Sequence, residues 1–376
     1  MNLSELDYDL PPERIAQRPL ARRDASRLLL LDRGTGKWEN RQFAEFPSLL
    51  EGNELVVVNN ARVIPARLFG FRAGVRAQPP GRRDPERGSF LKSRIEVLLV
   101  RRLGEPATWE ALVRPGRKIG VGETITFGEG ELKAYVEARG SFGLRRLQFS
   151  PAEGFETAVN RLGHVPLPPY IRRADEPPDR ERYQTIFARE ARAVAAPTAG
   201  LHFSPEVTAR MRERGIEFAE ITLDVGLGTF EPVRTSILER HQIHSETYEI
   251  PPATAEAINR AHVTKRPVVA IGTTVVRALE DAAAKCLERS LDSSRASRPE
   301  RDISIQPGRA EADIFLYPGK AFRVVDRLLT NFHLPRSTLL ALVAAFAGLD
   351  HVLAAYRHAV DSGYRFYSYG DCMFIR

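Results

Sequence analysis

Residues 268–280 read Val-Val-Ala-Ile-Gly-Thr-Thr-Val-Val-Arg-Ala-Leu-Glu, and this stretch determines the fold class that we expect. Four consecutive apolar residues, Val268 to Ile271, predict a short strand that is buried on both faces. Gly272 predicts a turn, and the two threonines after it are typical of the start of a helix. A buried strand that leads directly into a helix is the repeating unit of an α/β fold.

The same alternation continues on both sides of this stretch after about residue 156. It predicts a parallel sheet, open or closed as a barrel, with functional groups at the carboxyl ends of its strands. Residues 285–311 are charged and rich in Ser, which predicts a surface insertion without chemistry of its own. Strand patterns lie at 194–197, 217–225 and 323–329, and helix patterns at 205–214, 253–262, 274–285, 337–347 and 351–360.

Residues 61–155 follow a different pattern, because short apolar, β-branched stretches are separated by Gly and Pro without a helical period. Strands at this spacing predict a small closed or nearly closed β-barrel. Within it, residues 72–94 form a basic loop rich in Pro and Gly. We therefore expect an α/β protein in which a barrel-like α/β catalytic domain, residues 1–60 and 156–376, carries an inserted all-β barrel domain, residues 61–155.

Positive charge is concentrated in the predicted insertion. The chain of 376 residues has 55 Lys and Arg against 48 Asp and Glu, a net charge of +7. Residues 61–155 hold 18 basic and 10 acidic residues, a net charge of +8, and the rest of the chain is close to neutral. This distribution favours a docking surface for a polyanion. A genome biased toward arginine codons is the alternative explanation for the total.

Several protein classes are excluded by composition and by missing motifs. The two cysteines, Cys286 and Cys372, are far apart, which excludes a disulfide scaffold and a cysteine-built zinc site. The polar N-terminus does not resemble a signal peptide, and the longest apolar run, Leu339 to Ala347, is too short to span a bilayer. A P-loop, a HExxH motif and a GxSxG elbow are absent. We expect a cytoplasmic protein without membrane contact.

Four polar clusters stand where strands of the α/β portion are expected to end. For each cluster the alternative is structural: a hydrogen-bonding histidine in a turn, a plain capped helix or an ordinary loop. The third cluster, which contains Thr273, Thr274 and Arg277, is a favourable site for a carboxylate or phosphate, because free N–H groups and two hydroxyls meet at a helix start. The residues that we single out are Thr198 and His202, Asp224 and Gly226, Thr273, Thr274 and Arg277, and Asn331 and His333.

His241, His244 and Glu246 bring two imidazoles and a carboxylate close together in the sequence. Histidines at positions i and i+3 alone are weak support for a metal site. A metal-dependent barrel hydrolase that uses His202, Asp224, His241 and His244 remains an alternative, but we expect no metal. A non-catalytic RNA-binding protein is a second alternative.

With these motifs assembled, the sequence resembles the S-adenosylmethionine:tRNA ribosyltransferase-isomerase family of queuosine biosynthesis nearly end to end. The resemblance also includes His244-Ser-Glu246 and the four polar clusters. The remaining motifs are Asp7-Tyr-Asp-Leu-Pro-Pro12, Ile15-Ala-Gln-Arg-Pro19, Arg22-Arg-Asp-Ala-Ser-Arg27, Asn59-Asn-Ala-Arg-Val-Ile-Pro-Ala-Arg-Leu68, Leu112-Val-Arg-Pro-Gly116, Pro166-Leu-Pro-Pro-Tyr-Ile171, Arg182-Tyr-Gln-Thr185 and Tyr364-Arg-Phe-Tyr-Ser-Tyr-Gly-Asp371.

The resemblance implies a specific fold and reaction. The fold is an α/β barrel-like domain with an inserted β-barrel. In the reaction, S-adenosylmethionine donates its ribosyl moiety to a 7-aminomethyl-7-deazaguanine base in tRNA, adenine and methionine leave, and the sugar rearranges to give epoxyqueuosine-tRNA. S-adenosylmethionine is then a consumed co-substrate, no other cofactor is expected, and a monomer is implied.

This reaction needs a base for the C5′ proton, a proton for the departing adenine, an anion site for the methionine carboxylate and cations for tRNA phosphates. We expect catalytic roles for His202, His244 and Glu246. We expect tRNA phosphate contacts from Arg22, Arg23, Arg114, Arg117 and Lys118. Substrate binding is expected from Arg62, Arg67, Thr198, Asp224, Gly226, Thr273, Thr274, Arg277, Asn331 and His333.

Two positions depart from the family pattern. Asp224 stands where the family usually has His, which suggests that this position binds or orients substrate and carries no unique chemistry. Ala312 stands where a Thr is expected before Asp313-Ile-Phe315. Together with the insertion at residues 285–311, Ala312 suggests a remodelled loop.

Overall fold

The computed structural model describes residues 1–73, 94–116, 119–140, 143–224, 226, 235–241, 243, 245–292 and 304–376, with the backbone alone at 73 and 290–292. The basic loop expected at 72–94 therefore lies almost entirely outside the described residues. The chain divides into two compact units, which are described separately. The first unit is Met1–Arg62, Pro168–Ala174 and Glu181–Arg376, and the second is Val63–Leu167 and Asp175–Arg180.

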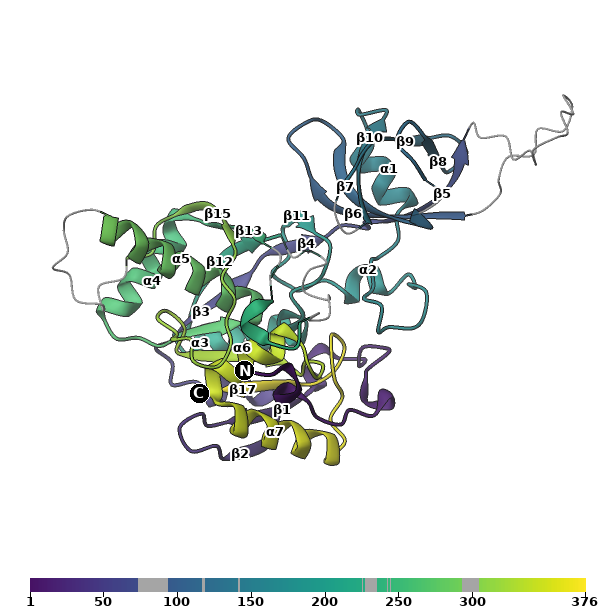
Figure 1. Cartoon of the computed structure of the whole chain (residues 1–376). Helices are drawn as coiled ribbons and strands as arrows, with labels where there is room; N and C mark the ends of the chain where they lie inside the picture. Colours follow the sequence, from purple (N-terminus) through teal and green to yellow (C-terminus); the bar gives the residue numbers. More distant parts are fainter. Residues whose placement is uncertain are drawn as a thin grey trace, which may run out of the picture. The chain divides into compact units, whose positions relative to one another are not determined.

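The first unit is built on a nine-stranded sheet in the order β15-β13-β12-β3-β14-β16-β17-β1-β2 (Figure 1). Its strands are β1 (Arg27–Leu31), β2 (Trp38–Gln42), β3 (Leu55–Asn59), β12 (Glu217–Leu223), β13 (Glu246–Ile250), β14 (Val268–Ile271), β15 (Gly308–Ala312), β16 (Arg327–Asn331) and β17 (Cys372–Ile375). A separate two-stranded sheet pairs β4 (Ala61–Val63) with β11 (Glu190–Ala193).

The expectation of a parallel sheet is correct for the centre of this sheet and wrong for the rest. Strand β14 is parallel to both of its neighbours, β3 and β16, and β3 is parallel to β12. Strand β17 is antiparallel to β16 but parallel to β1, and β13, β15 and β2 also pair antiparallel. The sheet is mixed because β2 pairs directly with β1 as its antiparallel neighbour in the chain and because β17 enters between β16 and β1.

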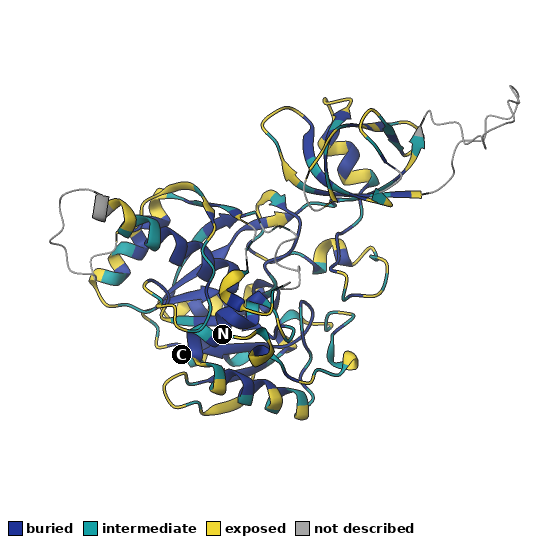
Figure 2. Ribbon diagram, viewed as in Figure 1, coloured by how far each residue is buried: buried dark blue, intermediate teal, exposed yellow. Residues whose placement is uncertain are grey.

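Helices cover both faces of the sheet, so its central strand β14 is apolar at every position. Within β14, Val268 and Ala270 join one core cluster, and Val269 and Ile271 join the other. Successive side chains of a strand point to opposite faces, which explains this division. The first cluster contains residues of α4 (Pro252–Val263), α5 (Thr273–Asp292), α6 (Thr338–Ala347) and α7 (Leu349–Asp361), and the second contains residues of α3 (Pro205–Glu213) and the 3-10 helix η4 (Phe43–Leu49) (Figure 2).

Helices α6 and α7 meet at Gly348, whose φ of +86° suits glycine. Ser337 caps α6 because its side chain accepts a hydrogen bond from the N–H of Leu340. No single helix in the described part of the chain is long and apolar enough to cross a membrane. Helices α6 and α7 pass that test only as a pair, bent by 116°.

Three element predictions need correction. Helix α5 continues past Lys285 to Asp292, and the edge strand β15 also lies within the stretch expected to be an insertion. Residues 293–303 of that stretch are outside the described residues. The strand expected at 323–329 is β16, which begins at Arg327, because the N–H groups of Arg323, Val324 and Val325 are bound by the buried Glu280 carboxylate.

The second unit contains a closed antiparallel barrel in the order β10-β7-β6-β5-β8-β9. Buried and outward side chains alternate along its strands, as expected when one face fills a barrel interior. The unit extends beyond residue 155 because Phe155 of α1 (Phe155–Leu162) packs on Phe149, with ring centroids 4.9 Å apart. The strands are β5 (Arg67–Ala73), β6 (Arg94–Arg102), β7 (Thr108–Arg114), β8 (Thr124–Phe127), β9 (Leu132–Arg139) and β10 (Leu144–Ser150). The α/β class with an all-β barrel is confirmed.

Candidate functional site

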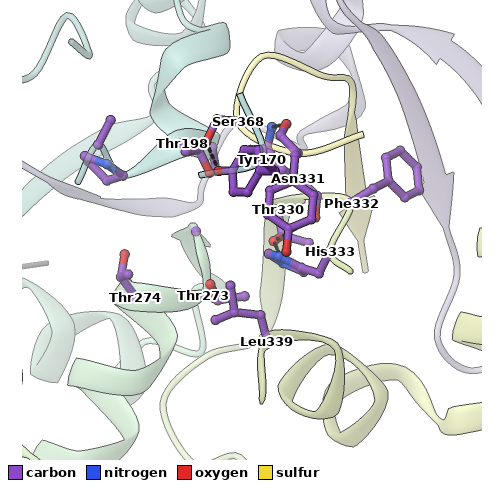
Figure 3. Close-up of a pocket in the computed structure, with 15 residues that line it drawn as sticks. Tyr170, Thr198, Thr273, Thr274, Thr330, Asn331, Phe332, His333, Leu339 and Ser368 are labelled. Carbon is purple, nitrogen blue, oxygen red and sulfur yellow. Dashed lines mark hydrogen bonds between the residues drawn. The ribbon is translucent and has the colours of Figure 1, made fainter. Parts of the chain in front are cut away.

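A pocket in the first unit lies at the carboxyl ends of β14 and β16, the edge of the sheet where we expected functional groups (Figure 3). It is open to solvent, and its empty space, solvent included, is about 500 Å³. We call it the junction pocket, because the junction between β14 and α5 forms one wall. Its lining residues are Tyr170, Ala196, Pro197, Thr198, Ala199, Gly272, Thr273, Thr274, Thr330, Asn331, Phe332, His333, Leu339, Tyr367 and Ser368.

The junction itself is a sharp turn from strand to helix. Gly272 has a φ of +98°, which residues with a side chain rarely adopt, and its N–H donates to the carbonyl oxygen of Leu329 at 2.8 Å. Helix α5 starts at the next residue, so its first N–H groups have no acceptor within the helix. Thr274 Oγ1 is buried without a hydrogen-bond partner among the described residues. The junction therefore offers an anion several donors in one place.

Asn331, the last residue of β16, is held with one polar group turned away from any partner. Its Nδ2 donates to the carbonyl oxygen of Tyr367 at 3.0 Å. Its Oδ1 is buried, and no described residue donates to it. Tyr367 has a φ of +73°, an uncommon conformation for a residue with a side chain. Such conformations gather at functional sites, and this one fixes the direction of the Asn331 amide.

His202 is the last residue of the 3-10 helix η7 (Thr198–His202). Its side chain is next to Asn331 but lines a second pocket. Its Nδ1 is 2.8 Å from Ser26 Oγ, and its Nε2 is buried without a hydrogen-bond partner among the described residues. Burial lowers the pKa of His202 to about 4, and the charges of Arg365 and Arg23 act in the same direction. The Asn331 side chain opposes this shift because it can accept a hydrogen bond from the protonated ring. The imidazole is thus neutral at pH 7 and able to accept a proton.

His333 is also neutral, but its ring has a partner. Its Nε2 lies 2.8 Å from Thr330 Oγ1, and burial lowers the pKa of His333 to about 3. The hydroxyl of Tyr356 accepts a hydrogen bond from the N–H of His333, and Tyr8 donates to its carbonyl oxygen. In Figure 3, His333 and Asn331 lie on the same stretch of chain, across the pocket from Thr273 and Thr274. His333 is therefore a fixed hydrogen-bonding group of the pocket wall.

Glu246 and Arg277 form a buried ion pair beside a neighbouring pocket that also touches Thr273 and Thr274. Arg277 Nη1 donates to Glu246 Oε2 at 2.9 Å, and its Nη2 and Nε donate to the carbonyl oxygens of Ala312 and Ile314. The other carboxylate oxygen, Oε1, accepts from the N–H of Gly226 at 3.2 Å. The two predicted residues are thus brought together, with both carboxylate oxygens of Glu246 occupied.

Other predicted residues lie away from the junction pocket. Asp224 pairs with Arg192, Oδ1 to Nε at 3.1 Å, and burial raises the pKa of Asp224 against the effect of that arginine. Arg62 is exposed on β4. In the barrel unit, Arg67 donates to the carbonyl oxygen of Leu167 and Arg114 is exposed at the end of β7. His244, Arg117 and Lys118 are outside the described residues.

Four residues were not singled out from the sequence although they contribute to the site. Tyr170, Tyr367 and Ser368 line the junction pocket, and Ser26 holds His202. Tyr170 and Ser368 are joined by a hydrogen bond between their hydroxyls, drawn in Figure 3. Each lies within a stretch that resembles the family, so this resemblance was the available indication. Among the described residues, no group of three or more His, Cys, Asp or Glu side chains is arranged to hold a metal ion.

The chain is similar to known proteins over its full length. Residues 3–375 match the family described as queuosine biosynthesis protein. The S-adenosylmethionine:tRNA ribosyltransferase-isomerase of Solibacter usitatus (strain Ellin6076) is 51% identical over 376 residues, and that of Moorella thermoacetica (strain ATCC 39073 / JCM 9320) is 49% identical, each with 100% of both chains covered. The crystal structure of S-adenosylmethionine tRNA ribosyltransferase from Thermotoga maritima is 36% identical, with 99% of this chain and 100% of that chain covered and a TM-score of 0.51.

Proposed function

Because the chain belongs to the queuosine biosynthesis protein family, we propose that it is an S-adenosylmethionine:tRNA ribosyltransferase-isomerase. The observation that carries this proposal is the identity of 51% over the full length of a relative with that name. The reaction moves the ribosyl moiety of S-adenosylmethionine to the aminomethyl group of 7-aminomethyl-7-deazaguanine in tRNA. Adenine and methionine are released, and epoxyqueuosine-tRNA is formed. We place the enzyme in the cytoplasm and propose that it acts as a monomer without a further cofactor.

The start of α5 is the proposed site for the methionine carboxylate of the donor. The N–H groups of the first helical turn and the free Oγ1 of Thr274 are fixed donors for an anion. Thr273 is the first residue of the helix and lines the same pocket. Arg277, one turn later, contributes positive charge behind this wall while it stays bound to Glu246. The carboxylate of the donor then needs no unpaired cationic side chain in the pocket.

His202 is the proposed base for the C5′ proton next to the sulfonium. A neutral imidazole with its proton on Nδ1, donated to Ser26 Oγ, has the Nε2 lone pair available. After proton transfer to Nε2, the new N–H donates to Asn331 Oδ1, which has no other described donor. The lowered pKa favours this role over that of an acid for adenine, because the ring carries one proton at neutral pH. Direct transfer requires the ribosyl group to lie at Asn331.

The other candidates keep supporting roles in this proposal. Thr198 and His333 orient the ribose or the modified base from the walls of the junction pocket. Glu246 holds Gly226 and Arg277, and His244, outside the described residues, stays a candidate for protonation of adenine. Asp224 positions Arg192, and Arg62 on β4 and Arg67 on β5 are assigned to substrate contact. Phosphates of tRNA are assigned to Arg22, Arg23, Arg114, Arg117 and Lys118.

Adenine release tests the proposal directly. Purified protein is incubated with S-adenosylmethionine and tRNA that carries the 7-aminomethyl-7-deazaguanine base, and free adenine is measured by chromatography. We expect adenine in proportion to modified tRNA, and none with tRNA that lacks the precursor base. Folded protein that releases no adenine under these conditions would contradict the proposal.

A further inference from the structure

A second hollow in the first unit is lined by three arginines, and two of them, Arg22 and Arg23, are among the residues assigned to tRNA phosphates. It is open to solvent, with about 270 Å³ of empty space in all, and is lined by Arg22, Arg23 and Arg182, with Ser26, His202 and Ser368 among the other residues. None of the described residues that line it is acidic. We call it the arginine pocket.

Two of these guanidinium groups are fixed by neutral acceptors. Arg23 donates to the carbonyl oxygens of Leu201 at 3.3 Å and Glu181 at 2.9 Å. Arg182 donates to the carbonyl oxygens of Ala21 at 2.8 Å and Leu20 at 2.7 Å. These contacts fix the orientation of both side chains but do not neutralise their charge. Consistent with this, burial and the nearby Arg182 lower the pKa of Arg23.

The third guanidinium, Arg22, is paired with a carboxylate. Its side chain is 76% exposed, and its Nε and Nη2 each lie 3.1 Å from an oxygen of Asp24, which is buried. A guanidinium has five N–H donors, so Arg22 can donate to an anion in the hollow while it stays bound to Asp24.

The arginine pocket is next to the proposed reaction site. Ser368 lines both this hollow and the junction pocket. His202 lines the hollow, and its ring is close enough to Asn331 of the junction pocket for a hydrogen bond between them to affect its pKa. The two pockets therefore adjoin. In a nucleotide, the phosphate lies one sugar away from the base, so a base in the junction pocket places its phosphate toward the arginine pocket.

We propose that the arginine pocket binds one phosphodiester group of the RNA substrate, adjacent to the nucleotide that is modified. This inference rests on the proposed function and adds Arg182 to its residues. The single carboxylate of the donor already has a site at the start of α5, so the remaining anions of the two substrates are RNA phosphates. A phosphodiester also matches arginine well, because two of its oxygens accept from a planar guanidinium.

The decisive variants are Arg182→Gln and Arg23→Gln, with kinetics measured separately for each substrate. We expect the KM for precursor tRNA to rise about tenfold, as for one lost charged hydrogen bond, with kcat and the KM for S-adenosylmethionine retained. The slope of log tRNA affinity against log salt concentration should fall by the amount expected for about one lost phosphate contact. Arg210→Gln is the matched control, because this exposed arginine of α3 also donates to a main-chain carbonyl, that of Ala44, and lines neither pocket. Its KM values should not change.

Two further measurements keep the test independent of folding and of turnover. Arg22→Gln removes the charge that pairs with the buried Asp24 carboxylate, so its stability is measured alongside, and it should raise the KM for tRNA by a smaller factor. Inorganic phosphate should compete with tRNA in a binding assay without S-adenosylmethionine, more strongly than chloride at equal ionic strength, and this advantage should disappear in Arg182→Gln. That binding assay remains informative even if the wild-type protein releases no adenine. An unchanged KM for tRNA in all three variants, or a rise in the KM for S-adenosylmethionine instead, would overturn the assignment.

Discussion

Two buried polar groups lie one helical turn apart on α5 and differ in whether they have partners. Thr274 Oγ1 has no hydrogen-bond partner among the described residues, whereas Arg277 donates to Glu246 and to two carbonyl oxygens. Both residues were singled out from the same stretch of sequence. Burial is similar for the two, so burial alone does not distinguish a binding group from a structural one.

The difference between them indicates where a ligand is needed. A buried polar atom without a partner costs free energy, and a ligand that supplies the partner recovers this cost. Thr274, Asn331 and His202 each have such an atom, and the Glu246 carboxylate has none. Substitution of Thr274, Asn331 or His202 should therefore change substrate binding or the reaction rate. Substitution within the Glu246–Arg277 ion pair should instead change the stability of the fold. The following predictions test this division.

The largest effect is expected for His202→Gln. Loss of a general base typically slows a reaction by 10² to 10⁴, so adenine release should fall by about a thousandfold, with the KM for S-adenosylmethionine changed little. The measurement is adenine release under saturating substrates. His262→Gln is the control, because His262 on α4 lies 3.4 Å from the carbonyl oxygen of Val324 and lines neither the junction pocket nor the arginine pocket, so this variant should retain the wild-type rate. A fall of less than tenfold in His202→Gln would assign the proton to another group.

Glu246→Gln should mainly affect stability. The substitution leaves the Arg277 charge buried without its counterion, which should reduce the free energy of unfolding by about 3 kcal/mol. Urea denaturation measures this loss. If the variant is as stable as the wild type, the pair does not have the structural role that separates it from Thr274.

Stability against pH should depend on His202. The folded protein holds its pKa at about 4, below the value of about 6.5 in an unfolded chain, so the unfolded state binds more protons between these values. Stability is then lost as pH falls from 6.5 toward 4, by about 3 kcal/mol from this group. His202→Gln should lose less stability over this range than the wild type. Identical pH dependence in the two proteins, measured by denaturation, would contradict the buried neutral state.

Thr274→Val should separate binding from stability. The valine has nearly the shape of threonine but lacks the unpartnered hydroxyl, so the free energy of unfolding should stay within about 1 kcal/mol or increase. The KM for S-adenosylmethionine should rise about tenfold, because one hydrogen bond to the carboxylate is lost. Thr254→Val is a useful contrast, since Thr254 donates to the carbonyl oxygen of Glu220 and its loss should lower stability without an effect on KM.

The smallest effect is expected for Asp224→His, which introduces the residue that the resemblance to the family implies at this position. Asp224 is paired with Arg192 outside the junction pocket, and a partly exposed pair contributes about 1 kcal/mol or less. Adenine release should change by less than about threefold, a ratio that corresponds to less than 1 kcal/mol. A much larger change would show that position 224 takes part in the reaction.

Much of the fold could be predicted from local sequence pattern. Strand β14 and the start of α5 follow from an apolar run, a glycine and two threonines, and the barrel strands follow from alternation. Strand β15, Gly-Arg-Ala-Glu-Ala, lies at the sheet edge, where charged residues are tolerated, so its sequence resembles a loop. The mixed strand directions depend on long-range pairing, which local pattern does not contain.

The site could be predicted in part for the same reason. Thr198, Thr273, Thr274, Asn331 and His333 line one pocket because each follows a strand end, a local property that is visible in the sequence. The contributions of Ser26, Tyr170 and Ser368 depend on contacts between segments far apart in the chain, such as the one between Ser26 and His202. The pairing of Glu246 with Arg277 was likewise not predictable from their separate motifs.

The position of β17 inside the sheet has a consequence for biosynthesis. Residues Leu28–Leu31 pair with Cys372–Ile375, which emerge from the ribosome about 340 residues later. At elongation rates of about 5–20 residues per second this is a delay of tens of seconds, during which one side of β1 has no strand partner and exposes unpaired N–H and C=O groups. The gap between β1 and β16 closes only when β17 arrives. The sheet of the first unit is therefore completed only after nearly all of this sequence has been synthesised, and until then the free side of β1 can pair wrongly with other strands.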